Sequence, residues 1–348
     1  MKISLRPYQV GDEVQLSRLQ AQRLSFSFEP QFWRWKYAEV PGAKQLTAVA
    51  YTPKGIIGAW GVVPFRLKVG QQTWVGCQDV DHFIVKEYRR GNTFLSLHGF
   101  TAQLKREHGM AFSYGVPVKS LKRIGVRLFK YREIGQVRKY VKVLNEVFFV
   151  QPYLKKRWLV QLAAKLVHGV QVIYSLPWRL GRSHFSVGEV HRFDDSFDRF
   201  WSQVAEHFPI AVVRDSKYLN WRFTAVPGIN YKILKAEKEG RVFGYIVLKV
   251  DGENPCRGYI MDLIAKNVAV LQDLVKASLG YFQSRGVDVV VFWILGPPVI
   301  RNALKRFGFM ERPLDRALIF KAHNPGFPLT LAEDLNNWYL TTADCDMH

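Results

Sequence analysis

An internal repeat constrains this chain more than any other feature of its 348 residues. The segment 35–42, WKYAEVPG, returns at 221–228 as WRFTAVPG, which is 186 residues later. A second pair, LKRIGV at 121–126 and LKRFGF at 304–309, follows in the same order with a shift of 183 residues. Two echoes with nearly equal spacing indicate that one fold of about 130–150 residues, an ordinary domain size, occurs twice.

Length and composition fit two globular domains. A chain of 348 residues is long for a single core, and a hydrophobic content of 48% is enough to fill two. The three cysteines lie far apart, so they form neither a disulfide framework nor a metal-binding pattern. We therefore expect no metal and a cytoplasmic setting, and the N-terminal residues predict no signal peptide.

The net charge of +21 is large and unevenly distributed. From Lys119 to Arg182 the chain carries fifteen Lys and Arg residues and two acidic residues, so under a fifth of the chain holds more than half of the excess. A local positive field of this size attracts phospholipid, nucleic acid or acidic polysaccharide. The alternative is a general basic offset that only aids solubility.

Both copies are predicted to contain the same succession of strands and helices. In the first copy the strands are expected at 46–51, 56–63, 78–85 and 111–116, with helices at 94–108 and 121–124. In the second copy the strands are expected at 231–236, 242–250, 258–264 and 287–295, with helices at 268–284 and 299–307. Mixed strands with helices between them, present twice, predict an α/β or α+β fold of two similar halves.

The repeat also sets the predicted domain borders. Residues 1–145 and 189–322 are the two domains, 146–188 a basic amphipathic linker, and 323–348 a C-terminal tail. Within the linker, 153–183 combines basic residues and Trp with an apolar run that polar residues interrupt. This pattern favours an interfacial helix in peripheral contact with an anionic membrane, at its inner face. A buried linker helix and a true membrane span are the alternatives.

The run 81–94, DHFIVKEYRRGNTF, resembles the acyl-CoA-binding segment of the GNAT superfamily of N-acetyltransferases. That family typically shows a strand, then Arg-x-x-Gly-x-Gly/Ala, then a helix. Backbone N–H groups at a helix N-terminus form a cradle for a pyrophosphate. With Arg89 in the place of the family's Arg, the expected glycines fall on Asn92 and Phe94. The closing elements LKRIGV and LKRFGF resemble the family's Tyr-x-x-Leu-Gly-Phe.

The resemblance implies two tandem GNAT-like domains, each a mixed twisted sheet flanked by helices. It implies acetyl-CoA or another acyl-CoA as cosubstrate, held in the first domain. The residues that it assigns to this cosubstrate are Val85, Arg89, Arg90, Gly91, Asn92 and Thr93.

Catalysis in this family often uses a carboxylate that takes a proton from the amine and a tyrosine that protonates the departing thiolate. The position of that tyrosine corresponds here to Leu121, and in the second copy to Leu304. Tyr114 on the adjacent strand, or a water molecule, is therefore expected as the proton donor. Asp81 is expected as the base, and the alternative for Asp81 is a local cap or salt bridge.

The second copy has Asp262 in the place of Asp81, but its cradle segment 266–270 reads KNVAV, without glycine or arginine. We expect this half to bind no acyl-CoA and to serve as a structural or acceptor-binding half. The repeated WKYAEVPG and WRFTAVPG elements occur in both halves. They are interpreted as packing elements, or alternatively as an aromatic wall for the acceptor.

The leading hypothesis is an N-acyltransferase that moves an acyl group from acyl-CoA to an amine, such as an amino sugar or an envelope glycan precursor. One alternative is an aminoacyl-tRNA-dependent transferase of cell-wall or lipid modification, because the basic segment suits tRNA phosphates. The other is a non-catalytic binding module on the same fold. No zinc motif, Gly-x-Ser-x-Gly motif or P-loop occurs in the sequence.

Overall fold

The structure is a computed structural model that describes residues 3–22, 29–42, 46–89, 92–179 and 184–345. The chain forms two compact units, and each unit takes segments from distant parts of the sequence. The N-terminal unit comprises residues 1–134, 212–229 and 318–333, and the C-terminal unit comprises residues 135–211, 230–317 and 334–348. The domain borders predicted from the repeat, 1–145 and 189–322, describe the two copies along the sequence rather than these compact units. They stay a prediction.

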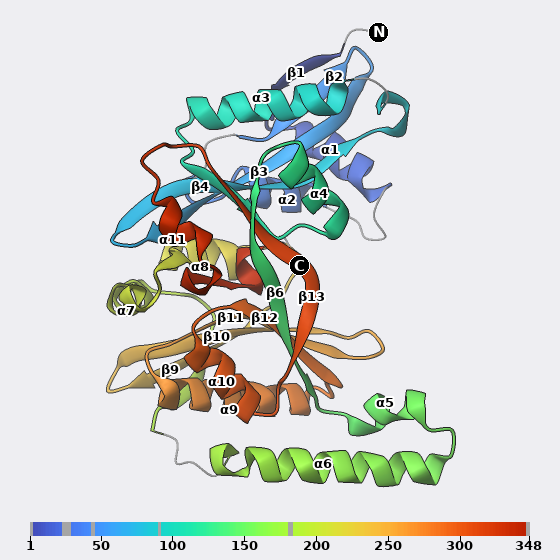
Figure 1. Ribbon diagram of the computed structural model, residues 1–348, viewed down its shortest axis with the longest axis vertical. Helices are drawn as coiled ribbons and strands as arrows, with labels where there is room; N and C mark the ends of the chain where they lie inside the picture. The colour runs from blue at the N-terminus through green and yellow to red at the C-terminus, as the bar shows by residue number, and fades with distance from the viewer. Residues whose placement is uncertain (1–2, 23–28, 43–45, 90–91, 180–183, 346–348) are drawn as a thin grey trace. The chain divides into compact units, whose positions relative to one another are not determined.

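The N-terminal unit is a mixed sheet with the strand order β1-β2-β3-β4-β5-β13 (Figure 1). Its strands are β1 (Ser4–Pro7), β2 (Ala48–Thr52), β3 (Gly55–Val69), β4 (Gln72–Ile84), β5 (Phe112–Gly115) and the end of β13 (Met310–Ala322). Its helices are α1 (Asp12–Ala21), α2 (Pro30–Tyr37), η1 (Lys86–Tyr88), α3 (Thr93–Glu107), α4 (Lys119–Arg127), α8 (Ser216–Phe223) and α11 (Leu329–Glu333). Only β4 and β5 pair in parallel among the paired strands described here.

The core of this unit lies between α3 and the sheet. Helix α3 turns Leu97 and Leu104 inward, where they pack with Trp60 of β3 and Cys77 of β4. These helix positions are seven residues apart, which is two turns, so they share one face. The predicted helix at 94–108 is therefore confirmed, and its apolar face rests on the strand that carries Asp81.

The C-terminal unit is a second mixed sheet with the order β6-β12-β11-β10-β9-β7. Its strands are β6 (Arg132–Val143), β7 (Ser186–Val190), β8 (Ile210–Val212), β9 (Lys232–Lys238), β10 (Arg241–Asp251), β11 (Arg257–Ala265), β12 (Val289–Leu295) and β14 (Trp338–Thr341). Its helices are α5 (Glu146–Val150), η2 (Gln151–Tyr153), α6 (Arg157–Arg179), α7 (Asp195–Val204), η3 (Ala205–His207), α9 (Val268–Ser284), α10 (Pro298–Arg306), η4 (Leu335–Asn337) and η5 (Thr342–Asp344). Strands β11 and β12 are parallel, as β4 and β5 are.

The closing strand of each sequence copy completes the sheet of the other unit. Strand β6, the last strand of the first copy, pairs antiparallel with β12 in the C-terminal unit. Strand β13, the last strand of the second copy, pairs antiparallel with β5 in the N-terminal unit. The predicted mixed α/β fold is confirmed, and the exchange explains why the two compact units interleave along the chain.

The repeated tryptophans meet within the N-terminal unit. Trp35 of α2 and Trp221 of α8 stack with ring centroids 5.0 Å apart and planes 17° apart. Each indole donates its Nε1–H to the carbonyl of the other residue, at 2.7 Å from Trp35 and 2.9 Å from Trp221. Both indoles are buried, with exposed fractions of 1% and 6%. This reciprocal contact supports the packing interpretation of the repeated element.

The predicted amphipathic segment at 153–183 contains α6, which is a continuous helix over Arg157–Arg179. Its last predicted residues, 180–183, lie outside the described part of the chain. Among the residues that the structure describes, no helix combines the length and apolar character needed to cross a bilayer.

Candidate functional site

Strand β4 carries a bulge near its C-terminal end. The register with β3 shifts between Ala59 and Gly61, so that Asp81 and His82 together lie opposite Trp60. Asp81 has a φ of 48°, in the left-handed region that non-glycine residues rarely occupy. Bulges change the direction of side chains and are frequent beside active sites. The bulge of β4 lies at Asp81, the residue predicted to be the base.

Two donors from α2 hold the Asp81 carboxylate. Its Oδ2 accepts hydrogen bonds from Lys36 Nζ and Tyr37 OH, each at 2.6 Å. The side chain is 14% exposed. No described residue donates to Oδ1, so one carboxylate oxygen stays available. The salt bridge expected as the alternative therefore exists, and the role of Asp81 as a base stays a prediction.

Helix α3 begins with its first-turn donors uncapped. The side chain of its N-cap residue, Asn92, makes no capping hydrogen bond, and the first backbone bond runs from Ser96 N–H to the Asn92 carbonyl at 2.8 Å. The backbone N–H groups of residues 93–95, which come before Ser96, therefore have no acceptor within the helix. No acidic side chain occupies the first turn. This end of the helix favours an anion.

The corresponding helix of the C-terminal unit is closed by its own side chain. The N-cap residue of α9, Asn267, accepts a hydrogen bond from Val270 N–H at 3.0 Å. Asparagine thus stands at the N-cap of both helices but satisfies the donors of only one. This contrast agrees with the expectation that the acyl-CoA cradle belongs to the first copy.

The other predicted cosubstrate residues lie between β4 and α3. The backbone N–H and carbonyl of Val85 both form hydrogen bonds within the protein. The N–H donates to the Ile57 carbonyl of β3 at 2.8 Å, and the carbonyl accepts from Tyr88 N–H at 3.0 Å. Arg89 is exposed and donates Nε to the Ile84 carbonyl at 2.9 Å, which fixes the guanidinium at the end of β4. Arg90 and Gly91 lie outside the described residues.

Tyr114, the predicted proton donor, is buried in β5 with an exposed fraction of 1%. Its ring contacts Phe65 at a centroid distance of 5.9 Å and Phe112 at 6.2 Å. Alternation along the strand puts its neighbour Ser113 on the opposite face. No hydrogen bond joins Tyr114 to Asp81, although the structure describes both residues, and their joint role stays a prediction.

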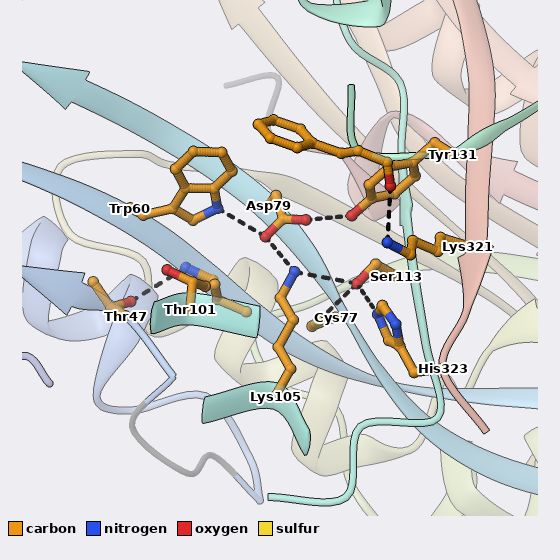
Figure 2. A network of polar contacts seen from close by, with 12 residues as sticks. Thr47, Trp60, Cys77, Asp79, Thr101, Lys105, Ser113, Tyr131, Lys321 and His323 are labelled. Carbon is orange, nitrogen blue, oxygen red and sulfur yellow. Dashed lines mark hydrogen bonds and ion pairs between the residues drawn. The ribbon is translucent and has the colours of Figure 1, made fainter. Parts of the chain in front are cut away.

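A buried polar network, centred on Asp79, lies on the α3 face of the N-terminal sheet (Figure 2). Lys105 Nζ of α3 lies 2.5 Å from Asp79 Oδ1, which also accepts a hydrogen bond from Trp60 Nε1 at 2.9 Å. The Tyr131 hydroxyl donates to Asp79 Oδ2. We call these residues, with Ser113, Cys77 and His323, the Asp79 network.

Ser113 links the ion pair to β13. Its Oγ lies 3.3 Å from Lys105 Nζ, 3.3 Å from Cys77 Sγ and 2.8 Å from Nε2 of His323, the residue that follows β13. Four separate segments of the chain therefore meet at the Ser113 hydroxyl: β4, α3, β5 and the residue after β13. The network fastens α3 and the exchanged strand β13 to the sheet.

The ion pair stays charged in spite of its burial. Burial by itself raises the pKa of the Asp79 carboxyl, but the Lys105 ammonium and the hydrogen bonds from Lys105, Tyr131 and Trp60 outweigh it, so the pKa lies below its ordinary value. Burial lowers the pKa of Lys105, and the Asp79 charge more than restores it, so that pKa is raised. Burial and Asp79 raise the pKa of Tyr131 well above its ordinary value.

Two histidines, His323 in the Asp79 network and His98 beside it, are held neutral. Burial, together with the nearby Lys105 and Lys321 charges, lowers the pKa of His323 to about 4. Burial also lowers the pKa of His98 to about 4, and the His98 ring stacks on Phe129 with centroids 3.6 Å apart. At neutral pH the network is thus charge-balanced and closely hydrogen-bonded, which suits positioning rather than proton transfer.

His82 differs from these two histidines in its hydrogen bonding. It stacks on Trp60 with centroids 4.3 Å apart, next to the bulge. Its Nδ1 is buried and has no hydrogen-bond partner among the described residues. Burial lowers its pKa, so the ring is neutral near pH 7 and carries an unused polar atom beside Asp81. An unpartnered buried group there fits a site that receives a polar ligand.

In the second copy the residue that corresponds to Asp81 is structural. Asp262 is fully buried and accepts hydrogen bonds from Tyr245 OH at 2.7 Å and Thr341 Oγ1 at 2.9 Å. Both carboxylates thus bind a tyrosine hydroxyl at a bulge, but Asp262 uses both of its oxygens. This difference agrees with a structural or acceptor-binding role for the second half.

The Asp79 network was not predicted from the sequence. Two signals in the sequence pointed to it: the carboxylates at the end of a strand, and Lys105 on the same helix face as the apolar positions Leu97 and Leu104. A lysine on the buried face of a helix requires an anionic partner. The partner could not be chosen from the sequence, because Asp79 and Asp81 were both available on the same strand.

No family model matches the sequence, and no curated protein sequence matches it. Solved structures do. A GCN5-related N-acetyltransferase from Anabaena variabilis is 12% identical, with a TM-score of 0.64, and the match covers 92% of this chain and 73% of that one. A probable N-acyltransferase from Enterococcus faecalis is 10% identical, with a TM-score of 0.65 and coverages of 92% and 72%.

The N-myristoyltransferase of Saccharomyces cerevisiae, solved with bound myristoyl-CoA, is similar as well. It is 11% identical with a TM-score of 0.63, and the match covers 92% of this chain and 79% of that one. At such identities the likeness concerns the fold. The chain therefore has the GNAT fold over most of its length, as the resemblance of the segment 81–94 predicted.

Proposed function

We propose that this protein is an N-acyltransferase whose N-terminal unit binds acyl-CoA at the first turn of α3 and transfers the acyl group to an amine. The observation that carries the proposal is the uncapped N-terminus of α3 beside the bulge of β4. The GNAT fold supports it, since the structural neighbours include a probable N-acyltransferase and an N-myristoyltransferase. The matching helix of the second copy lacks the feature, so it is not a general property of the fold.

The residues present fit the cosubstrate. The first-turn N–H groups from Thr93 onward would bind the diphosphate, and Arg89 would add positive charge. A bound acyl-CoA supplies the acyl group already activated as a thioester. Asp81 Oδ1 would take the proton that the amine loses, while Lys36 and Tyr37 hold the other oxygen. Tyr114 is the proposed proton donor to the leaving thiolate.

The acceptor in this proposal is a small molecule or glycan that bears an amine, such as an amino sugar. Support comes from the basic composition, because a net charge of +21 attracts anionic sugars and envelope precursors. A panel of amino sugars and nucleotide sugars, assayed for release of free thiol from acetyl-CoA, tests this part separately from cosubstrate binding.

The decisive experiment is calorimetric titration of acetyl-CoA and myristoyl-CoA into the wild type and two matched variants. Asn92→Asp puts a carboxylate at the open end of α3, where it caps the helix and repels phosphates. We expect this variant to lose at least tenfold in affinity, an order of magnitude typical of one lost charge-assisted contact. Asn267→Asp makes the same change at α9 and should leave acyl-CoA binding unchanged.

Equal loss in both variants, or in neither, would contradict the assignment of the cradle to α3. Absence of binding to the wild type would remove acyl-CoA as the cosubstrate. Aminoacyl-tRNA binding that weakens steeply with salt would then favour the tRNA-dependent alternative. Asp81→Asn tests the base: we expect kcat to fall with little change in acyl-CoA affinity.

A further inference from the structure

A pocket of about 490 Å³ lies on one face of the C-terminal sheet. Trp293 of β12 pairs with Lys139 of β6, and Tyr259 of β11 pairs with Val291 of β12. All four line the pocket, since residues paired across strands leave the sheet on the same face. The volume falls in the range of about 300–1,000 Å³ that small-molecule sites occupy.

The N-terminal unit shows how this face is filled when no pocket is present. Cys77 and Gly258 each lie four residues before the matched residues Asp81 and Asp262, so they occupy corresponding positions of β4 and β11. Cys77 lies opposite Ser113 of β5, and Gly258 lies opposite Val290 of β12, so Ser113 and Val290 correspond as well. The strand β12 therefore has valines at 289 and 291, where β5 has aromatic residues at 112 and 114.

Aromatic rings close the face in the N-terminal unit. Phe112 stacks on Phe320 at 5.8 Å and contacts Phe327 at 5.3 Å between centroids. Phe327 in turn contacts Trp74 at 5.3 Å. The smaller valines of the C-terminal unit leave the corresponding volume open. The same face of the duplicated fold is thus filled by aromatic side chains in the N-terminal unit and hollow in the C-terminal unit.

Both apolar and cationic groups line the pocket. Its apolar part comes from Val141, Tyr259, Met261, Val289, Val291, Trp293 and Leu314. Its charged part is three cations against one carboxylate. Lys249 forms an ion pair with Asp251 at 2.9 Å. Lys139 and Arg257 have no ion-pair partner among the described residues, so two cations stand unneutralised beside an apolar wall.

Trp293 supplies an independent sign of a missing ligand. The side chain is only 4% exposed, and its Nε1 has no hydrogen-bond partner among the described residues. A buried N–H donor without an acceptor costs about 1–3 kcal/mol, and such groups are rare in folded proteins. An acceptor oxygen on a bound molecule would satisfy the Trp293 N–H. Lys139, the residue opposite Trp293 in β6, could neutralise the charge of that molecule.

We propose that this pocket binds an anionic amphiphile, with its apolar body on the valine wall and its phosphate or carboxylate beside Lys139 and the Trp293 indole. Arg257, which pairs with Val289 four residues before Trp293 in β12, adds positive charge at the other end of the wall. The binding site itself stands on the pocket, the cations and the unsatisfied indole.

The test uses three probes that share an eight-carbon chain: octyl phosphate, octanoate and octanol. Full-length protein labelled with ¹⁵N at the indoles is titrated, and the Trp293 Nε1–H signal is assigned from Trp293→Phe. We expect octyl phosphate to shift this signal and octanol to leave it in place. The relative affinities of octyl phosphate and octanoate then distinguish a phosphate headgroup from a carboxylate.

Four variants, one of them a control, localise the binding. Lys139→Gln should weaken octyl phosphate binding roughly tenfold, as expected for one charge-assisted hydrogen bond. Arg257→Gln should weaken it to a smaller extent, because Arg257 acts through its charge from the other end of the wall. Lys276→Gln removes an exposed charge from α9 and serves as the matched control, with no change expected. Val291→Tyr copies Tyr114 and should fill the pocket, provided that its unfolding transition matches the wild type.

Equal binding of octanol and octyl phosphate, or unchanged affinity in both charge variants, would overturn the proposal. A shift of other indole signals without that of Trp293 would do so too. These outcomes are independent of acyl-CoA binding at α3, so the failure of one proposal is distinguishable from the failure of the other.

Discussion

At the scale of single residues, the structure separates two neighbouring carboxylates of β4 by their partners. Asp79 is enclosed by Lys105, Tyr131 and Trp60, and both of its oxygens accept hydrogen bonds. Asp81 accepts hydrogen bonds through Oδ2, and no residue in the described part of the chain donates to its Oδ1. This difference favours a positioning role for Asp79. The role of Asp81 as the base stays a proposal, which needs the unused lone pair of a proton acceptor.

Replacing one residue of the Asp79–Lys105 ion pair should destabilise the protein more than replacing both together. Asp79→Asn or Lys105→Met alone should lower the free energy of unfolding by about 3–5 kcal/mol, because each leaves a buried charge without its partner. The double variant should lose clearly less than the sum of the two. Urea denaturation of the four proteins measures the coupling, and strictly additive losses would argue against a direct ion pair.

His323 should make the protein less stable in mild acid. Its pKa is about 4 in the folded state and 6.5 ordinarily, so between these values the unfolded chain binds more protons. The free energy of unfolding should therefore fall as the pH drops from about 6.5 towards 4. His323→Gln keeps a hydrogen-bonding group for Ser113 and should flatten this dependence. Denaturation series between pH 7 and 4.5 compare the two proteins, and identical slopes would rule out His323 as the cause.

At the scale of elements, α6 carries an exposed apolar stripe with basic flanks. Trp158, Leu162 and Leu166 follow one another at intervals of four residues and are 63%, 50% and 64% exposed. Exposed basic residues surround the stripe: Lys155, Lys156, Arg157 and Lys165. The chain has no acidic residue between Glu146 and Glu189. This arrangement suits the surface of an anionic membrane.

We expect the full-length protein to sediment with vesicles of phosphatidylserine and phosphatidylcholine, and much less with phosphatidylcholine alone. Leu162→Gln should reduce binding several-fold, since one buried leucine side chain contributes about 1.5–3 kcal/mol. Val299→Gln, at a 50% exposed position of α10, is the matched control. Equal binding of both variants to anionic vesicles would exclude α6 as the contact surface.

At the scale of the whole molecule, the exchange of closing strands ties the two sequence copies together. The N-terminal unit needs β13 beside β5, and it needs Trp221 against Trp35. Both come from the second copy. A fragment of the first copy alone would expose the β5 edge and uncover a tryptophan that is now 1% exposed.

Residues 1–145 expressed alone should therefore lack a cooperative unfolding transition, whereas the full chain should show one. Far-UV circular dichroism during urea titration, with the full chain as the reference, provides the measurement. A sharp transition in the fragment would mean that the first copy folds without the exchanged strand.

The sequence by itself determined the duplication, the mixed α/β fold and the place of the helix that starts after β4. These features depend on local periodicity and on short motifs, which neighbouring residues encode. The sequence also placed Asp81, Asn92 and Thr93 at one junction, because a strand, a turn and a helix that follow each other directly must lie close together.

Only the tertiary structure decided which distant side chains meet. Ser113 and His323 are 210 residues apart, and Trp35 and Trp221 are 186 apart, yet each pair forms hydrogen bonds. The exchange of β6 and β13 and the hollow face over Val289 and Val291 have the same origin. Periodicity tells which face of an element is buried, but the partner on that face depends on strand order, and strand order is a property of the folded chain.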